Sequence, residues 1–195
     1  MTARDGYSVK RAKGEIALEF YDDADIPKNI EEPMKIDEQT FYDIIYLMKK
    51  TDAVKKGLEL LAYSQNTKSA LYQKLVQRGF ARDVSRDAVD YISSCGHINE
   101  YDMACSLVYD MANRRLYGPV RIKAELLSKG FPADVADRAI ADSDADLSDI
   151  CERRIEKLGG HEIFNEKTSR AKAIAALMRY GFSFDEIKTA MRKKS

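Results

Sequence analysis

The amino-acid sequence has few of the residues that mark several large classes of protein. It contains no Trp, four Pro, ten Gly, three Cys and two His among 195 residues, and 32 basic residues balance 32 acidic ones. Because 45% of the residues are apolar while Pro and Gly are sparse, disordered and collagen-like chains are excluded and a folded chain is expected. The zero net charge removes the simplest argument for a nucleic-acid-binding protein, which is a strongly basic domain.

Long apolar runs are also absent. The two longest, 44–48 and 173–178, are far shorter than the roughly 18 residues that a membrane-spanning helix needs. The first ten residues, MTARDGYSVK, lack the apolar core of a secretory signal. The three cysteines, at positions 95, 105 and 151, form no CxxC pair and fit a reducing compartment better than a disulfide framework. We therefore expect a cytoplasmic protein.

What the sequence does have is an internal repeat. Segments 70–89, 121–140 and 172–191 align without gaps at a spacing of 51 residues. Five positions coincide in all three segments: Leu75, Leu126 and Leu177; Gly79, Gly130 and Gly181; Phe80, Phe131 and Phe182; Asp83, Asp134 and Asp185; Ala88, Ala139 and Ala190. A fixed period of this kind is typical of a protein built from stacked copies of one supersecondary unit.

Each segment has the features of two helices joined by a corner. The Gly follows a helix at the position where a left-handed backbone ends it, and Gly adopts that conformation without strain. The Phe after it can fold back on the last turn, and the Asp three residues later is expected to cap the next helix. In the first segment Val84, Ala88, Tyr91 and Ile92 have the spacing of an apolar helix face.

Fifty-one residues exceed two such helices, so a third helix is expected before each pair. Apolar residues in 104–111 and in 52–62 recur at helical spacing, and Pro119 suits the first position of the helix that follows Gly118. Segment 146–158 is expected to be helical as well, with an insertion or deletion near Gly159 and Gly160.

Residues 1–50 differ in character. Alternation in 15–20 predicts a strand, and Lys13 and Gly14 can turn a hairpin with 8–12. Asp37 can cap a helix that continues to Met48. The predicted fold is mainly α, with three tandem three-helix repeats in a curved array after a short N-terminal β-hairpin and helix. The predicted boundaries are 1–50 for the N-terminal segment and 51–98, 99–145 and 146–195 for the three repeats.

The corner sequences LVQRGF at 75–80 and ELLSKGF at 125–131, the latter preceded by Gly118 and Pro119, resemble those of the RecX family of recombinase regulators. The resemblance covers nearly the whole chain and implies a short N-terminal segment before three such repeats. It also implies a function in DNA repair, recombination and the SOS response, since members bind the RecA filament on single-stranded DNA. They restrain its growth, ATP hydrolysis, strand exchange and coprotease activity.

Basic residues near helix ends are the candidates for binding such a partner. They are Arg78, Arg114, Arg115, Arg121, Lys123, Lys129, Arg153 and Arg154. A curved array would place them along one face, towards acidic protein surface or DNA phosphates. The alternative is that they interact favourably with the negative ends of helix dipoles and keep the protein soluble. Tyr72, Tyr109 and Tyr117 have the same two interpretations, as groups that stack on bases or as half-buried packing residues.

No catalytic residue, metal or cofactor is expected. The pairs Cys95 with His97 and Cys151 with His161 lack further ligands at zinc spacing, and a structural zinc site needs four. No HExxH, Walker loop or GxGxxG occurs. A regulator of the RecA filament is therefore the first hypothesis. A module that binds DNA directly and a helical adaptor for another protein are the alternatives, and a monomer is expected because no coiled-coil seam occurs.

Overall fold

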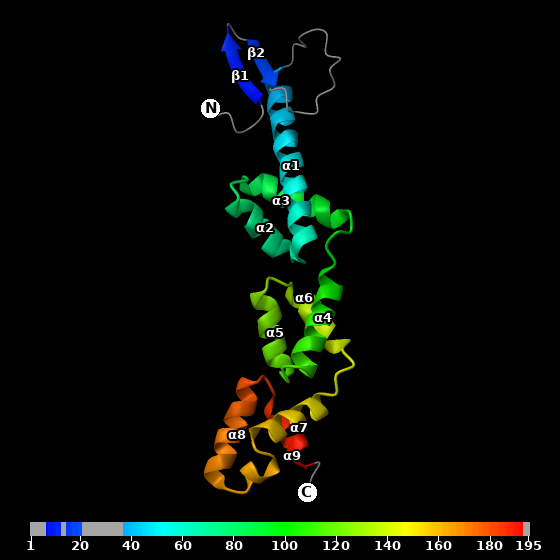
Figure 1. Ribbon diagram of the computed structural model, residues 1–195, viewed down its shortest axis with the longest axis vertical. Coiled ribbons are helices and arrows are strands. Elements are labelled where there is room, and N and C mark those ends of the chain that lie inside the picture. The colour runs from blue at the N-terminus through cyan, green and yellow to red at the C-terminus, as the bar shows by residue number, and fades with distance from the viewer. Residues whose placement is uncertain (1–6, 13–14, 21–36, 193–195) are drawn as a thin grey trace. The chain divides into compact units, whose positions relative to one another are not determined.

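The structure, a computed structural model, describes residues 7–12, 15–20 and 37–192, with side chains from residue 37 onwards. The elements in chain order are β1 (Tyr7–Ala12), β2 (Glu15–Phe20), α1 (Glu38–Tyr63), α2 (Lys68–Gln77), α3 (Arg82–Ser94), α4 (Glu100–Asn113), α5 (Pro119–Ser128), α6 (Ala133–Ala141), α7 (Leu147–Leu158), η1 (His161–Phe164), α8 (Lys167–Arg179) and α9 (Phe184–Arg192) (Figure 1). The chain divides into two compact units, residues 1–51 and 52–195. The prediction of a mainly helical protein is confirmed.

The two strands are the only β-structure among the described residues. β1 pairs with β2 in antiparallel register, from Tyr7 opposite Phe20 to Ala12 opposite Glu15. The turn that would make them a hairpin, at Lys13 and Gly14, lies outside the described residues, so the hairpin stays a prediction.

Helix α1 is longer than the sequence pattern indicated. The sequence predicted one helix ending near Met48 and another beginning near Asp52, but α1 runs without a break through both. Its start is as expected, because the carboxylate of Asp37 accepts from the N–H of Thr40 at 2.9 Å. The residues between the two predicted helices contain no Gly or Pro, so nothing in the backbone ends the helix there.

The three predicted Gly-Phe corners have one common geometry. Gly79, Gly130 and Gly181 have φ angles of 92°, 84° and 93°, in the left-handed region. In each corner the N–H of the Phe donates to the carbonyl of the aligned Leu five residues earlier, at 3.2 to 3.3 Å. The N–H of the Gly donates to the carbonyl three residues earlier, at 2.9 to 3.0 Å. These two bonds define a Schellman motif, so the predicted helix ends are confirmed.

The predicted Asp caps are wrong. The N-cap residues of α3 and α6 are Ala81 and Pro132, and neither makes a side-chain cap bond, while Asp83 and Asp134 lie two residues later, in the first turn. The helices begin two residues after the Phe, so these carboxylates meet the positive end of the helix dipole instead of the N-cap N–H groups. In the third corner Ser183 and Glu186 exchange side-chain bonds with each other's backbone N–H, a capping box.

The core is made by the residues that the repeat aligned. Leu75, Leu126 and Leu177 are each fully buried, as are the aligned alanines. Phe131 and Phe182 are buried, whereas Phe80 is half-buried. The prediction that Tyr91 lies on the buried face of its helix is wrong, because 53% of its surface is exposed. Val89 is buried there instead.

Equivalent joints connect successive corners. At the first joint the hydroxyl of Thr67 donates to the carbonyl of Lys129 at 3.2 Å. At the second joint, 51 residues on, the N–H of Gly118 donates to the carbonyl of Tyr180 at 2.8 Å, and the N–H of Val120 donates to that of Gly181 at 3.2 Å. Because Gly118 has no side chain, the two backbones come into direct contact there.

The third copy of the pattern departs from the other two where the sequence placed an insertion or deletion. After α7 the chain passes Gly159 and Gly160, both with positive φ, and forms the short helix η1 before α8. α8 has 13 residues, compared with 10 in α2 and in α5. Within the described parts of the chain, no helix is both long and apolar enough to cross a membrane.

Candidate partner-binding surface

The second joint brings together several of the predicted basic residues. Arg114 and Arg115 follow α4, Arg121 lies in the first turn of α5, and Arg153 and Arg154 lie on α7. The segment between α4 and α5 is held in place by Leu116, which is buried and has a φ of 54°. The structure thus places five of the eight candidates beside one loop.

Arg153 and Arg154 have their guanidinium groups bound to backbone. Nη2 of Arg153 donates to the carbonyl of Asn113 at 3.0 Å. Arg154 donates through Nε to the carbonyl of Leu116 at 3.3 Å and through Nη2 to that of Arg115. These carbonyls belong to the last residue of α4 and to the residues just after it, where the end of a helix leaves acceptors without intrahelical donors. The two arginines therefore have a structural role, as the alternative interpretation states.

Arg121 lies in an aromatic cluster at the same joint. Its guanidinium carbon lies 4.1 Å from the ring centre of Tyr117 and 5.8 Å from that of Tyr180. Arg154 covers the Tyr180 ring at 3.7 Å, so the two arginines and two tyrosines form cation–π contacts across the joint. Tyr117 is thus used in packing, which favours the structural interpretation of that residue.

Three further candidates are held in ion pairs. Arg114 and Arg115 both reach the carboxylate of Asp110, at 3.3 and 3.4 Å. Lys123 contacts Asp137 at 2.6 Å. Because the three cations are 41 to 79% exposed, each pair contributes little to stability, and the cations stay accessible to a competing anion.

Arg78 and Lys129 lie apart from the second joint, each at a corner. They are the C-cap residues of α2 and α5, and both are exposed. The guanidinium of Arg78 reaches the carbonyl of Lys74 at 3.5 Å, a long contact. Both cations favour the negative end of their helix dipole, yet they leave their charge open to solvent.

Basic and acidic residues are separated between helices, a pattern that the sequence analysis did not predict. We call α2 with Arg78, α5 with Lys129, and α8 the corner helices, since each leads into a Gly-Phe corner. Together they carry ten basic residues and one acidic residue, Glu125. In contrast, α4 carries three acidic and no basic residues, and α3 and α6 each carry one more acidic than basic residue. This separation of charge becomes visible when the alignment of the three repeats is combined with the observed helix bounds.

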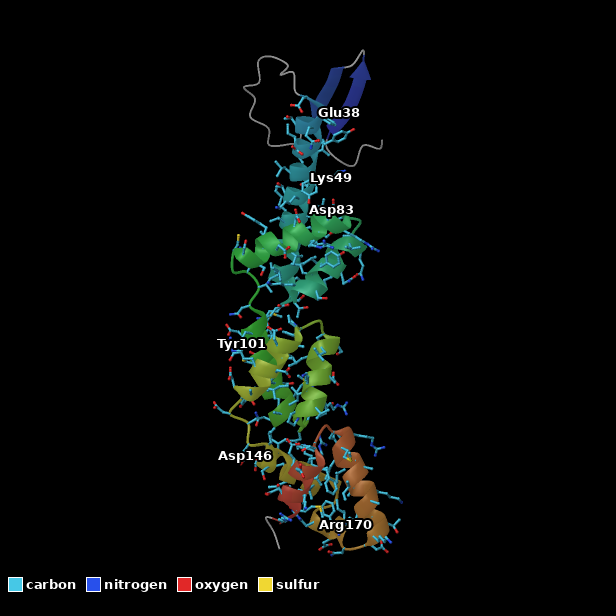
Figure 2. All side chains as sticks on the ribbon, turned by 180° about the vertical axis from the view of Figure 1, so that it is seen from behind. Glu38, Lys49, Asp83, Tyr101, Asp146 and Arg170 are labelled. Atoms are coloured by element: carbon cyan, nitrogen blue, oxygen red, sulfur yellow. The ribbon has the colours of Figure 1, made fainter. Side chains whose placement is uncertain are left out.

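Helix α8 is the most basic of the corner helices. It carries Lys167, Arg170, Lys172 and Arg179 and no acidic residue, and all four side chains are exposed. Arg170 is labelled in Figure 2. None of them takes part in an ion pair between described residues. This surface was not among the candidates, although a count of charges along the aligned segments would have found it.

The cysteines and histidines do not form a metal site in the described part of the chain, where no group of three or more His, Cys, Asp or Glu is close enough to hold an ion. Cys95 is exposed and Cys151 is buried. Burial, followed by the charges of Glu186 and Glu152, raises the pKa of the Cys151 thiol to about 12. A thiol that stays protonated is a poor zinc ligand.

Comparison with known proteins gives matches to RecX proteins. A family model described as "RecX, second three-helix domain" matches residues 99–140. The regulatory protein RecX of Xanthomonas axonopodis pv. citri (strain 306) is 28% identical over 144 residues, which are 74% of this chain and 88% of the relative. That of Stenotrophomonas maltophilia (strain K279a) is 29% identical over 143 residues, 71% of this chain and 85% of the relative.

Solved structures agree in fold. A crystal structure of RecX from Lactobacillus salivarius has a TM-score of 0.66 and 24% identity, and covers 74% of this chain and 96% of its own. A second one, described as a crystal structure of regulatory protein RecX, has a TM-score of 0.72 and 19% identity over 97% of this chain and 98% of its own. Over 71 to 74% of its length the chain is therefore similar to regulatory proteins of the RecX family, and its residues 99–140 match the family's second three-helix domain.

Proposed function

We propose that this chain is a non-enzymatic cytoplasmic regulator that binds the RecA recombinase filament on single-stranded DNA. It restrains the ATPase, strand-exchange and coprotease activities of that filament in DNA repair and recombination. Similarity to proteins of the RecX family supports this proposal, because the fold alone would not specify a function.

The observation that carries the proposal is the separation of charge between helices. The corner helices hold ten of the basic residues against one acidic residue, although the whole chain is neutral. A protein with such a pattern can attract an anionic partner at three spaced places without the general nucleic-acid affinity of a basic protein. Both the phosphates of filament DNA and acidic recombinase side chains are partners of that kind.

We propose further that the three copies form the curved array predicted from the sequence, so that the corner helices follow one another along the filament groove. Bridging neighbouring recombinase protomers would hinder protomer addition and the entry of a second DNA strand. α8 is the main contact in this arrangement, since its four cations have no acidic partner among the described residues, whereas Lys123 and Arg121 are paired.

Co-sedimentation with recombinase filaments assembled on single-stranded DNA tests this surface. The triple variant R170Q/K172Q/R179Q removes three exposed cations from α8. We expect its affinity for the filament to fall on the order of tenfold, and wild-type binding to weaken as salt rises.

The matched control is K157Q/K188Q/R192Q, which removes the same charge from exposed positions on α7 and α9 of the same copy. It should bind almost as the wild type does. Equal losses in the two triple variants would show that only net charge matters and would remove the role given to α8. Tight binding to bare DNA but not to filaments would instead favour a direct DNA-binding module.

A further inference from the structure

A cavity of about 290 Å³ lies in the groove between α2 and α3. Lys68, Ser69 and Tyr72 line it from α2, and Arg86, Val89 and Asp90 line it from α3. Val89 is its buried apolar lining residue, with 4% of its surface exposed, and Tyr72 is half-buried. Its volume is near the lower end of the range for small-molecule sites, roughly 300 Å³, so it holds one compact group.

The two cations of this cavity, Lys68 and Arg86, form no ion pair with a described residue. Within the described part of the chain, no ion pair involves Lys68, Arg86 or Asp90. The N-terminus of α2 itself is already used, because the N–H of Lys68 donates to the carboxylate of Glu100 at 2.9 Å. An anion in the cavity would therefore be held by the Lys68 and Arg86 side chains.

The repeat provides an internal comparison. A shift of 51 residues takes Tyr72 and Arg86 to Lys123 and Asp137, and those two form an ion pair at 2.6 Å across the corresponding groove. A further shift takes them to Ile174 and Lys188, which lack an aromatic ring. Of the three copies, the first combines an aromatic wall with two free cations.

We propose that this cavity binds one nucleotide unit of single-stranded DNA. The base stacks on the Tyr72 ring, the flanking phosphate contacts Lys68 and Arg86, and the Asp90 carboxylate accepts from an N–H group on the base edge. An aromatic ring beside cations is the combination by which proteins hold single strands without reading sequence. The choice of DNA over RNA rests on the proposed function, because the filament carries single-stranded DNA.

Fluorescence anisotropy with a 5′-labelled oligothymidine and the full chain tests this site without the recombinase. Tyr72→Ala and Arg86→Gln should each weaken binding on the order of tenfold, while Tyr72→Phe keeps the stacking ring and should bind as the wild type does. The slope of log affinity against log salt should fall by about 0.7 for Arg86→Gln, since one phosphate contact is lost. Lys188→Gln, at the aligned position of the third copy, is the matched control and should have no effect.

A photoreactive oligonucleotide that contains 5-iododeoxyuridine gives a second readout. Tyr72 should be cross-linked in tryptic peptide 69–74. Wild-type affinity for both Tyr72→Ala and Arg86→Gln, equal effects of Arg86→Gln and Lys188→Gln, or no binding of the oligonucleotide would each overturn the site. Filament binding would survive any of these results, so failure of this site is distinguishable from failure of the proposed function.

Discussion

Tyr101 on α4, labelled in Figure 2, forms a side-chain link to Asp142 at the end of α6. Its hydroxyl donates to the carboxylate of Asp142 at 2.7 Å, and the guanidinium of Arg138 covers its ring at 4.5 Å. The hydrogen bond to Asp142 is the main reason why the pKa of Tyr101 is raised from 10.0 to about 12. The folded state therefore favours the protonated phenol.

This raised pKa predicts a specific loss of stability at alkaline pH. Below pH 10 the contribution of the bond is fully present, and it disappears as the pH rises from about 10 to about 12, because the unfolded chain releases the proton first. The difference in free energy of unfolding between the wild type and Tyr101→Phe should be constant up to about pH 10 and shrink above it. Urea unfolding of both proteins across this range measures it, and a difference that stays constant to pH 12 would contradict the assignment.

The sequence identified side chains whose role is local and missed those whose partners are distant in the chain. Leu126, Gly130 and Phe131 were found because their function depends on neighbours within one helix turn, which the repeat preserves. Arg154 was interpreted as a binding residue because the carbonyls that it contacts belong to residues 38 and 39 positions away. No local pattern in the sequence indicates such a contact.

The corners differ in how much space surrounds the glycine. Gly79 has no heavy atom within 4 Å of an added Cβ, whereas a Cβ on Gly181 would overlap the backbone of Arg121 at the second joint. Gly79→Ala should thus lose only the conformational preference, about 1 to 2 kcal/mol. Gly181→Ala should lose more, because the hydrogen bonds between the two backbones must break as well. Thermal denaturation compares the two variants, and equal losses would show that the second joint adds nothing.

The phenylalanines of the corners give a graded test of burial. Phe131 is 4% exposed, and Phe131→Ala should cost on the order of 3 to 5 kcal/mol in the free energy of unfolding. Phe80 is half-buried, so Phe80→Ala should cost clearly less. Denaturant unfolding measures both, and the melting temperature of Phe131→Ala should fall before any binding constant changes. An unaltered melting temperature for Phe131→Ala would contradict the role given to the corner.

Helix positions were predictable where glycine or proline marks an end, and less so elsewhere. The ends at the three glycines and the start at Pro119 agree with the structure. The prediction that Asp83 and Asp134 cap their helices was wrong, because Ala81 and Pro132 occupy the N-cap positions. Continuity of α1 was missed because apolar spacing alone does not distinguish two adjacent helices from one.

For the chain as a whole, zero net charge was a poor guide to its surface. The sequence total hides the concentration of basic residues on the corner helices, which becomes visible only when the repeat register and the helix bounds are combined. The folded arrangement further separates cations bound to carbonyls or carboxylates, such as Arg153 and Lys123, from those on α8. The order of residues does not show which cations bind carbonyls or carboxylates and which do not.

The most direct test of the account is DNA-dependent ATP hydrolysis by the cognate RecA recombinase on single-stranded DNA, titrated with this chain. We expect inhibition at ratios well below one chain per recombinase protomer, because a regulator that bridges protomers or blocks filament growth acts on many at once. The R170Q/K172Q/R179Q variant should need a higher ratio for the same inhibition, while K157Q/K188Q/R192Q should not. Unchanged ATP hydrolysis at a stoichiometric excess of wild-type chain would contradict the proposed function and favour an adaptor for a different protein.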